Sequence, residues 1–219
     1  MKRTLLFTVL LLIVSGITVK AQTEKGKIFL AGSNRLELNI GGEKEKYNGD
    51  LVEGSEVSYF DFDFQPRIGY FFFDNFTAGL FMDVDLYTSK DKDEDYGYTT
   101  KGMTLIIGPF ARYYFHICDK LIPFAEGQVG FGIDNYKYKA NSGDEWDEYN
   151  EGVFTYRVGG GATYFFNDMV GADLFLGFNH SAYTYKNEDN GEVSRSDHKS
   201  KYIYNEFIMQ LGIVVLLGK

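Results

Sequence analysis

The residues with the clearest catalytic types are His180 and Ser181, with Asp189 and Asp197 a short distance downstream. An acyltransferase or a protease needs a base held close to a hydroxyl nucleophile, and this group supplies both. An adjacent His-Ser pair is common by chance, and none of the three histidines has a catalytic or metal-binding spacing. We therefore expect no enzymatic activity and assign no catalytic or cofactor-binding residue.

Clusters of acidic residues are the candidates for metal binding. Residues 91–95 and 144–148 are rich in Asp and Glu, whose carboxylate oxygens are the ligands that Ca²⁺ prefers. Neither cluster follows the spacing of an EF-hand loop, so we interpret both as solvated surface charge and assign no metal site. Trp146 and the tyrosines beside these acids suit contact with a partner or a glycan, or membership of an interfacial aromatic belt.

Residues 1–21 have the features of a signal peptide. Lys2 and Arg3 precede an apolar run from Leu5 to Val14, and the short side chain of Ala21 stands before a predicted cleavage at Gln22. The mature domain would span 22–219, with 19 basic against 31 acidic side chains and a net charge of −12. This acidity disfavours a nucleic-acid partner, because few cations are left to neutralise phosphates.

The elements that position the polar residues are eight predicted strands. Aromatic clusters at 70–75, 113–116 and 164–168 each mark a strand end at a short turn, and long polar stretches occur at 41–54, 88–101, 137–151 and 186–201. The intervals between them alternate apolar and polar residues at strand length. We predict strands at 26–40, 55–73, 76–87, 100–116, 121–138, 152–166, 169–185 and 201–217.

Successive side chains of a strand point to opposite faces, so each strand separates an apolar face from a polar one. Large aromatics gather at both ends of the apolar face, the polar face is rich in Gly and in charges of both signs, and short and long connections alternate. These features favour lipid outside and a polar, filled interior. The predicted interior network comprises Arg35, Glu37, Asp61, Asp63, Arg67, Asp83, Asp85, Arg112, Glu126, Asp134, Arg157, Asp173 and Glu206.

Two local predictions follow from the same pattern. Arg112 and Glu126 flank one short turn on the polar face, so their charges should meet inside the barrel. Pro66, Pro109 and Pro123 lie inside predicted strands, where each removes a ladder hydrogen bond. We interpret Pro66 and Pro109, each about four residues before a matched tyrosine, as β-bulges in the periplasmic half of the barrel.

Four segments carry a resemblance to the small outer-membrane β-barrels, the eight-stranded OmpA/OmpX-type porin-family domains: 26–30, 66–71, 108–114 and 123–127. The resemblance covers essentially all of the mature chain. It implies an all-β, eight-stranded antiparallel transmembrane up-and-down β-barrel in the outer membrane, with both termini periplasmic and the long loops extracellular. It also implies a monomer whose partners are outer-membrane lipid, lipopolysaccharide and, during insertion, the barrel-assembly machinery.

The last strand resembles the C-terminal insertion signal of such barrels, at positions Gln210, Gly212, Val215 and Leu217, although the chain ends without the usual terminal aromatic. Two functions remain open at this stage. One is a non-enzymatic barrel whose acidic loops serve surface interaction or envelope integrity. The other is a narrow porin or a small-molecule transport channel.

Overall fold

The protein is a closed antiparallel β-barrel with one additional strand. The computed structural model describes residues 23–35, 41–47, 50–91, 97–117, 120–140, 145–186 and 199–218. The strands found in these ranges are β1 (Ile28–Arg35), β2 (Gly41–Tyr47), β3 (Asp50–Phe73), β4 (Phe76–Asp91), β5 (Tyr98–Tyr114), β6 (Leu121–Ala140), β7 (Asp147–Phe165), β8 (Val170–Lys186) and β9 (Lys199–Leu217). No helix in this part of the chain is long and apolar enough to cross a membrane.

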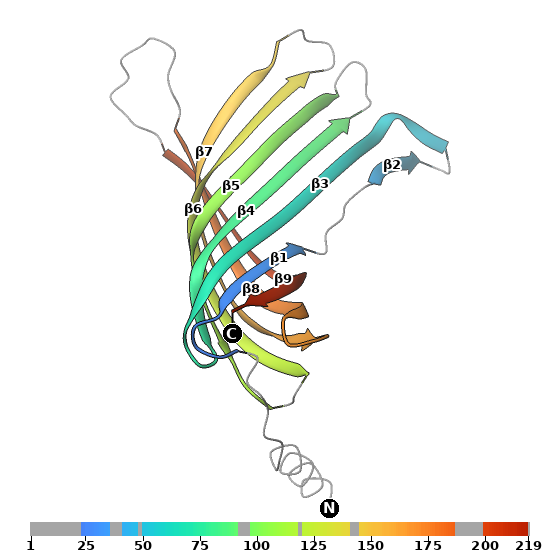
Figure 1. Cartoon of the computed structure of the whole chain (residues 1–219). Coiled ribbons are helices and arrows are strands. Elements are labelled where there is room, and N and C mark those ends of the chain that lie inside the picture. Colours follow the sequence, from blue (N-terminus) through green and yellow to red (C-terminus); the bar gives the residue numbers. More distant parts are fainter. Residues whose placement is uncertain are drawn as a thin grey trace, which may run out of the picture.

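Closure of the barrel depends on β1. This strand pairs on one side with β9, where Ile28 lies opposite Leu217, and on the other side with β3, where Ile28 lies opposite Tyr70. The strands from β3 to β9 pair with their neighbours in sequence order, so eight strands form a ring that β1 closes along its own length. Beyond β1, residues 199–209 of β9 pair only with β8 among the described residues. Figure 1 shows the strands curving around the barrel, with β2 beyond the end of β1 and alongside the far part of β3.

The eight predicted strands correspond to β1 and β3–β9, and the prediction that 41–54 is a long loop is wrong. This stretch contains β2 and the start of β3, which pair from Gly41 opposite Tyr59 to Tyr47 opposite Asp50. The sequence there is polar and charged, without the apolar face that the other strands display. A strand that pairs only with β3, beyond the closed ring, needs no such face.

The connections differ at the two ends of the barrel. The β3–β4, β5–β6 and β7–β8 connections lie at one end, which we call the short-turn end. The tightest of these turns is Asp74–Asn75, where Asn75 takes the left-handed backbone conformation (φ +69°) that asparagine tolerates. The described ends of the chain lie here too, because the Gly26 amide donates to the Phe71 carbonyl (2.9 Å) and Leu217 lies beside Ile28.

The two faces of the strands have the predicted polarity. Large apolar side chains such as Phe62, Leu80 and Leu176 are exposed on the outside, and Phe207 on β9 is 90% exposed. Charged side chains including Arg67, Arg112 and Glu126 are almost completely buried inside. The barrel is therefore apolar outside and polar inside, the reverse of a soluble barrel.

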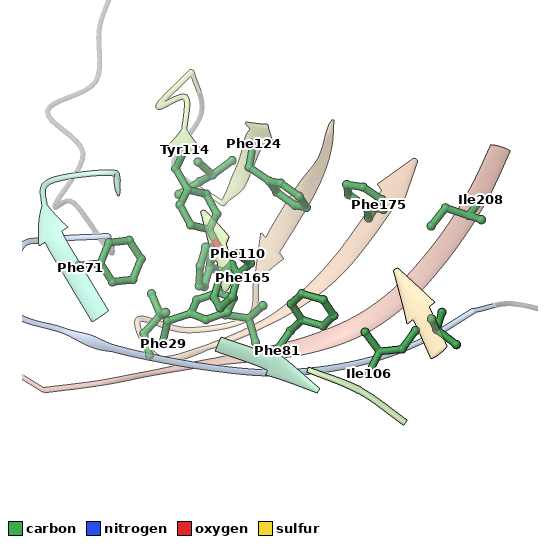
Figure 2. Close-up of a cluster of buried hydrophobic side chains, with 14 residues drawn as sticks. Phe29, Phe71, Phe81, Ile106, Phe110, Tyr114, Phe124, Phe165, Phe175 and Ile208 are labelled. Carbon is green, nitrogen blue, oxygen red and sulfur yellow. The ribbon is translucent and has the colours of Figure 1, made fainter. Parts of the chain in front are cut away.

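The expectation of a polar interior holds for only part of the lumen. Toward the short-turn end, the inner face carries a buried aromatic cluster that includes Phe29, Phe71, Phe110, Phe124 and Phe175. The Phe29 and Phe110 ring centroids lie 5.5 Å apart, and Phe124 stacks on Phe175 with an interplanar angle of 9°. Figure 2 shows these rings converging from several strands, with Ile106 and Ile208 on the side of the cluster away from Phe71. This half of the lumen is closed by apolar packing.

Pro66 and Pro109 are not bulges, so that prediction is wrong. The offset between β3 and β4 is the same before and after Pro66, and the offset between β5 and β6 is the same on both sides of Pro109. Pro123 lies in register opposite Ala162. A missing amide donor removes one ladder hydrogen bond without shifting the register, because the neighbouring pairs hold the strands in place.

Candidate functional site: a charged layer and an acidic cavity inside the barrel

A layer of ion pairs crosses the lumen beside the aromatic cluster. Arg112 Nε donates to Glu126 Oε2 at 2.6 Å, as predicted from their positions about one short turn. Arg112 Nη1 also donates to Asp173 Oδ2 at 2.6 Å, and Arg67 Nη1 donates to Glu126 Oε1 at 2.7 Å. These four side chains are at most 3% exposed in their ion pairs. Two cations and two anions balance, so the layer is electrically neutral.

The aromatic cluster supports this layer directly. The Arg112 guanidinium carbon lies 3.7 Å from the centroid of the Phe124 ring and 5.1 Å from that of Phe29. A guanidinium over an aromatic face gains a cation–π interaction, which is stronger where water is excluded. Arg112 Nη1 also donates to the Tyr114 hydroxyl at 3.0 Å, and Thr163 donates to Asp173 at 2.5 Å. The charged groups are thus held by both polar and apolar neighbours.

The predicted interior residues fall into two groups along the barrel axis. Arg67, Arg112, Glu126 and Asp173 form the neutral layer, whereas Asp83, Asp85, Asp134, Arg157 and Glu206 line a cavity nearer the other end. Asp63 is buried and Asp61 is half-buried. The backbone of Arg35 pairs with that of Gln210, and Glu37 lies outside the described residues.

The cavity lies in the half of the lumen farther from the short turns. Its volume is about 530 Å³. The expectation of a filled interior is wrong for this half of the barrel. The lining side chains come from six strands and are rich in carboxylates and tyrosines: Asp83, Asp85, Tyr87, Thr104, Ile106, Asp134, Tyr136, Glu151, Thr155, Arg157, Asn179, Ser181, Tyr183, Tyr202, Tyr204 and Glu206.

Several carboxylates of this cavity accept hydrogen bonds from uncharged donors. Asp134 accepts from the Thr104 hydroxyl at 3.0 Å and from the Tyr87 hydroxyl at 3.2 Å. Glu151 accepts from Tyr136 at 3.2 Å. These hydroxyls orient the carboxylates without cancelling their charge.

The cavity wall contains an ion pair between Arg157 and Asp83. Arg157 Nη2 approaches Asp83 Oδ2 at 3.4 Å, and Gln65 Nε2 donates to the same oxygen at 3.2 Å. The other oxygen of Asp83 is buried and has no hydrogen-bond partner among the described residues. Arg157 is the only cationic side chain among the residues that line this cavity.

Sequence reasoning missed two features of the cavity. Glu151 was expected in a solvated loop, but it lies in β7 and its side chain is buried. The lining tyrosines were not singled out, although the inner-face spacing of Tyr202, Tyr204 and Glu206 on β9 is a signal that could have identified them.

His180 and Ser181 do not form a nucleophile–base pair. Ser181 points into the lumen and contacts Thr155 Oγ1 at 3.2 Å. His180 is stacked on Tyr156 outside the barrel, and its Nδ1 lies 2.7 Å from Asn205 Oδ1. Adjacent strand residues face opposite ways, which separates the two groups. Asp189 and Asp197 lie outside the described residues.

The acidic stretch before and at the start of β7 is exposed where it is described. Glu145 and Asp147 face solvent, and residues 92–96 and 141–144 lie outside the described residues. Among the residues that are described, no group of three or more His, Cys, Asp or Glu side chains is placed to hold a metal ion. Trp146 contacts cations instead, with Lys137 Nζ 5.2 Å and Lys101 Nζ 5.8 Å from its ring centroid.

The four residues of the proposed insertion signal lie in the closing strand. Gln210 is buried in the lumen, Gly212 lies against the backbone of Gly32, and Leu217 faces outward beside Ile28. Val215 is half-buried opposite Leu30. Their role in membrane insertion stays a prediction.

No family model matches the sequence, and no curated protein matches it. Among solved structures, the chain is similar to the N-terminal β-barrel domain of OprF from Pseudomonas aeruginosa, with 15% identity, a TM-score of 0.37, and coverage of 88% of this chain and 98% of that one. The outer membrane protein OprG from the same species gives 12% identity, a TM-score of 0.43, and coverage of 91% and 100%. A major outer membrane protein from Thermus thermophilus gives 10% identity, a TM-score of 0.45, and coverage of 87% and 99%. The function is therefore inferred from the residues of this chain.

Proposed function

We propose that this protein is a non-enzymatic outer-membrane β-barrel whose lumen is sealed toward the periplasm and opens toward the cell surface as an acidic cup. Its role is surface interaction or envelope integrity. The observation that carries the proposal is the inverted polarity of the barrel, with large apolar side chains outside and ion pairs inside.

The apolar exterior supports lipid as the surrounding medium. Outward-facing residues on every strand from β3 to β9 expose Phe, Leu, Ile, Met, Val or Tyr, including Phe60, Ile107, Phe131, Leu174 and Phe207. A soluble monomer rarely exposes such a wide apolar surface. Where β1 joins β3 to β9, the ring of eight strands also satisfies the backbone in lipid, because each strand there is paired on both sides.

The packing of the lumen favours a sealed barrel over a channel. A solute moving through the barrel would have to pass both the Arg112 layer and the aromatic cluster, whose members Phe29, Phe71 and Tyr114 have no solvent-accessible surface. An eight-stranded barrel is just wide enough for its side chains to fill. Conduction would require separating Arg112 from two carboxylates in a poorly hydrated space, which is costly.

The lengths of the connections between strands indicate how the barrel is oriented in the membrane. Membrane barrels of this kind place short turns in the periplasm and longer loops outside the cell. The short-turn end holds both described ends of the chain and the aromatic cluster, and the acidic cavity lies toward the opposite end. The cavity would therefore face the extracellular side.

Two measurements test this function. Purified protein should migrate differently on gels before and after boiling, because the barrel resists detergent until heated. In planar lipid bilayers it should give no steady conductance. A protein that is soluble and monomeric without detergent would contradict the membrane assignment, and steady channel opening would favour the transport alternative over the sealed barrel.

A further inference from the structure

We propose that the lumen cavity binds a small organic cation that carries two ammonium groups on a short aliphatic stem, in the manner of an alkyl diamine. The site is formed by the carboxylates and tyrosines of β4, β6, β7, β8 and β9. The inference depends on the proposed function only for the side of the membrane from which the ligand arrives.

Charge imbalance is the first observation. The neutral layer below the cavity contains two arginines and two carboxylates. The cavity wall instead contains five carboxylates and one arginine, Arg157. Arg157 is the only cation among these lining residues, so the wall carries more acidic than basic side chains. Partly buried negative charges in excess are costly unless a counter-charge or water reaches them.

An oxygen of Asp83 is the second observation. Asp83 lines the cavity and is only 4% exposed. One of its carboxylate oxygens receives Arg157 and Gln65, while the other has no donor among the described residues. Because this oxygen has no donor and almost no accessible surface, a cation in the adjacent cavity would offset the charge of Asp83 from nearby rather than through a direct hydrogen bond.

The placement of the acids favours two separated ammonium groups over one. Asp83 and Asp85 are on β4, Asp134 is on β6, Glu151 is on β7 and Glu206 is on β9. The carboxylates therefore stand at different points around the wall. A single ammonium group cannot contact all of them, whereas a molecule with two cationic ends can contact opposite walls.

The tyrosines favour an organic cation over a metal ion. Tyr87, Tyr136, Tyr183, Tyr202 and Tyr204 line the cavity. These rings suit an organic cation, because its alkyl stem can pack on a ring and its ammonium group can lie over a ring face. A metal ion would require several carboxylates converging on one point, and no group of three such ligands occurs among the described residues. The volume of about 530 Å³ accommodates a small organic molecule.

Titration calorimetry on the folded full chain in a non-ionic detergent tests the proposal, with diaminobutane as the probe. We expect a Kd below about 1 mM that rises with ionic strength, and no binding of butanediol, which has the same stem without charge. Absence of diaminobutane binding would overturn the proposal. Equal binding of butanediol or of Mg²⁺ would overturn it in favour of a neutral or an inorganic ligand.

Matched variants locate the site. The double variant Asp134→Asn with Glu151→Gln removes two charges from the cavity and should weaken diaminobutane binding at least about tenfold. The control double variant Asp147→Asn with Glu145→Gln removes the same charges from exposed residues outside the cavity and should change Kd less than about twofold. Equal effects of the two would assign the binding to general surface charge and overturn the proposal.

A second cavity variant keeps the test decisive if the first fails to fold. Ser181→Lys places an ammonium group in the cavity wall and should abolish diaminobutane binding by occupying the site. Unboiled and boiled gels of each variant confirm that the barrel is formed. Wild-type binding by a folded Ser181→Lys protein would contradict the proposed location. Failure of the conductance or detergent tests above would instead count against the proposed membrane function.

Discussion

At the scale of single residues, Arg112 has the largest predicted effect on stability. It holds Glu126 and Asp173 together, and its removal leaves two buried carboxylates, of which Glu126 keeps Arg67. We expect Arg112→Met to lower the free energy of unfolding by about 3–5 kcal/mol. Urea unfolding in lipid vesicles measures this loss.

A double-mutant cycle separates contact from general destabilisation. Arg112→Met and Asp173→Asn should couple strongly, because the double variant removes both partners of one ion pair. The control cycle combines Arg67→Met with Asp173→Asn, two residues without a direct contact among the described residues, and should couple less. Additive losses in the first cycle would contradict the proposed network.

Burial of the His116 side chain at the short-turn end leads us to expect that the stability of the barrel depends on pH. Burial lowers the pKa of the His116 imidazole, whose Nε2 lies 3.3 Å from Thr23 Oγ1. The unfolded chain then binds the proton more readily than the folded one, so stability is fully present above the unfolded pKa of about 6.5 and declines as the pH falls below it. Unfolding measured from pH 8 to pH 5 should show this extra decline in the wild type relative to His116→Asn. Parallel profiles would mean that His116 does not contribute.

Residue patterns predicted part of the site. Arg112 and Glu126 were identifiable as partners because they flank one turn on the polar face. Asp173 and Arg67 come from strands distant in sequence, and their convergence on the same pair depends on the curvature of the whole barrel. The buried aromatic cluster was missed because runs such as 70–73 are aromatic on both faces, so alternation does not reveal an apolar inner patch.

At the scale of strands, glycines set how closely neighbours approach. A methyl group on Gly79 would collide with the Ile68 carbonyl oxygen and the Gly69 α-carbon of β3. The equivalent group on Gly127 would have no neighbour nearer than 4.0 Å. The requirement for glycine is therefore strong at the first position and weak at the second.

We expect Gly79→Ala to lower the free energy of unfolding by about 1–3 kcal/mol, because the β3 backbone must shift to accommodate it. Gly127→Ala should change it by less than about 0.5 kcal/mol. The two variants differ from the wild type by the same methyl group, so urea unfolding compares them directly. Equal effects would mean that the lack of a side chain at Gly79 does not determine how closely β3 and β4 approach each other.

Strand positions were predictable because one physical rule governs all eight strands of the ring. Each has an apolar outer face, and this produces alternation over its whole length. β2 lacks this alternation because it lies beyond the ring and pairs only with β3. The extensions of β4, β6 and β7 into predicted loops have the same cause, since backbone pairing continues where the apolar face ends.

At the scale of the whole molecule, the proposed orientation predicts which connections are accessible on intact cells. A peptide tag inserted at Gly143, between β6 and β7, should be labelled from outside. A tag inserted at Asp168, between β7 and β8, should be labelled only after the outer membrane is permeabilised. The reverse pattern would place the acidic cavity on the periplasmic side.

The inverted polarity of the barrel is the central claim, and quenching by brominated lipid tests it most directly. Ile106 and Ile107 are neighbours on β5, one 6% exposed and facing the lumen, the other 57% exposed and facing outward. Each is changed to Trp in a Trp146→Phe background, which removes the only native tryptophan. In vesicles of brominated lipid, the fluorescence of the Ile107→Trp protein should be strongly quenched and that of the Ile106→Trp protein should be nearly unchanged. Equal quenching of both, or stronger quenching at position 106, would contradict a barrel with lipid outside and a polar lumen inside.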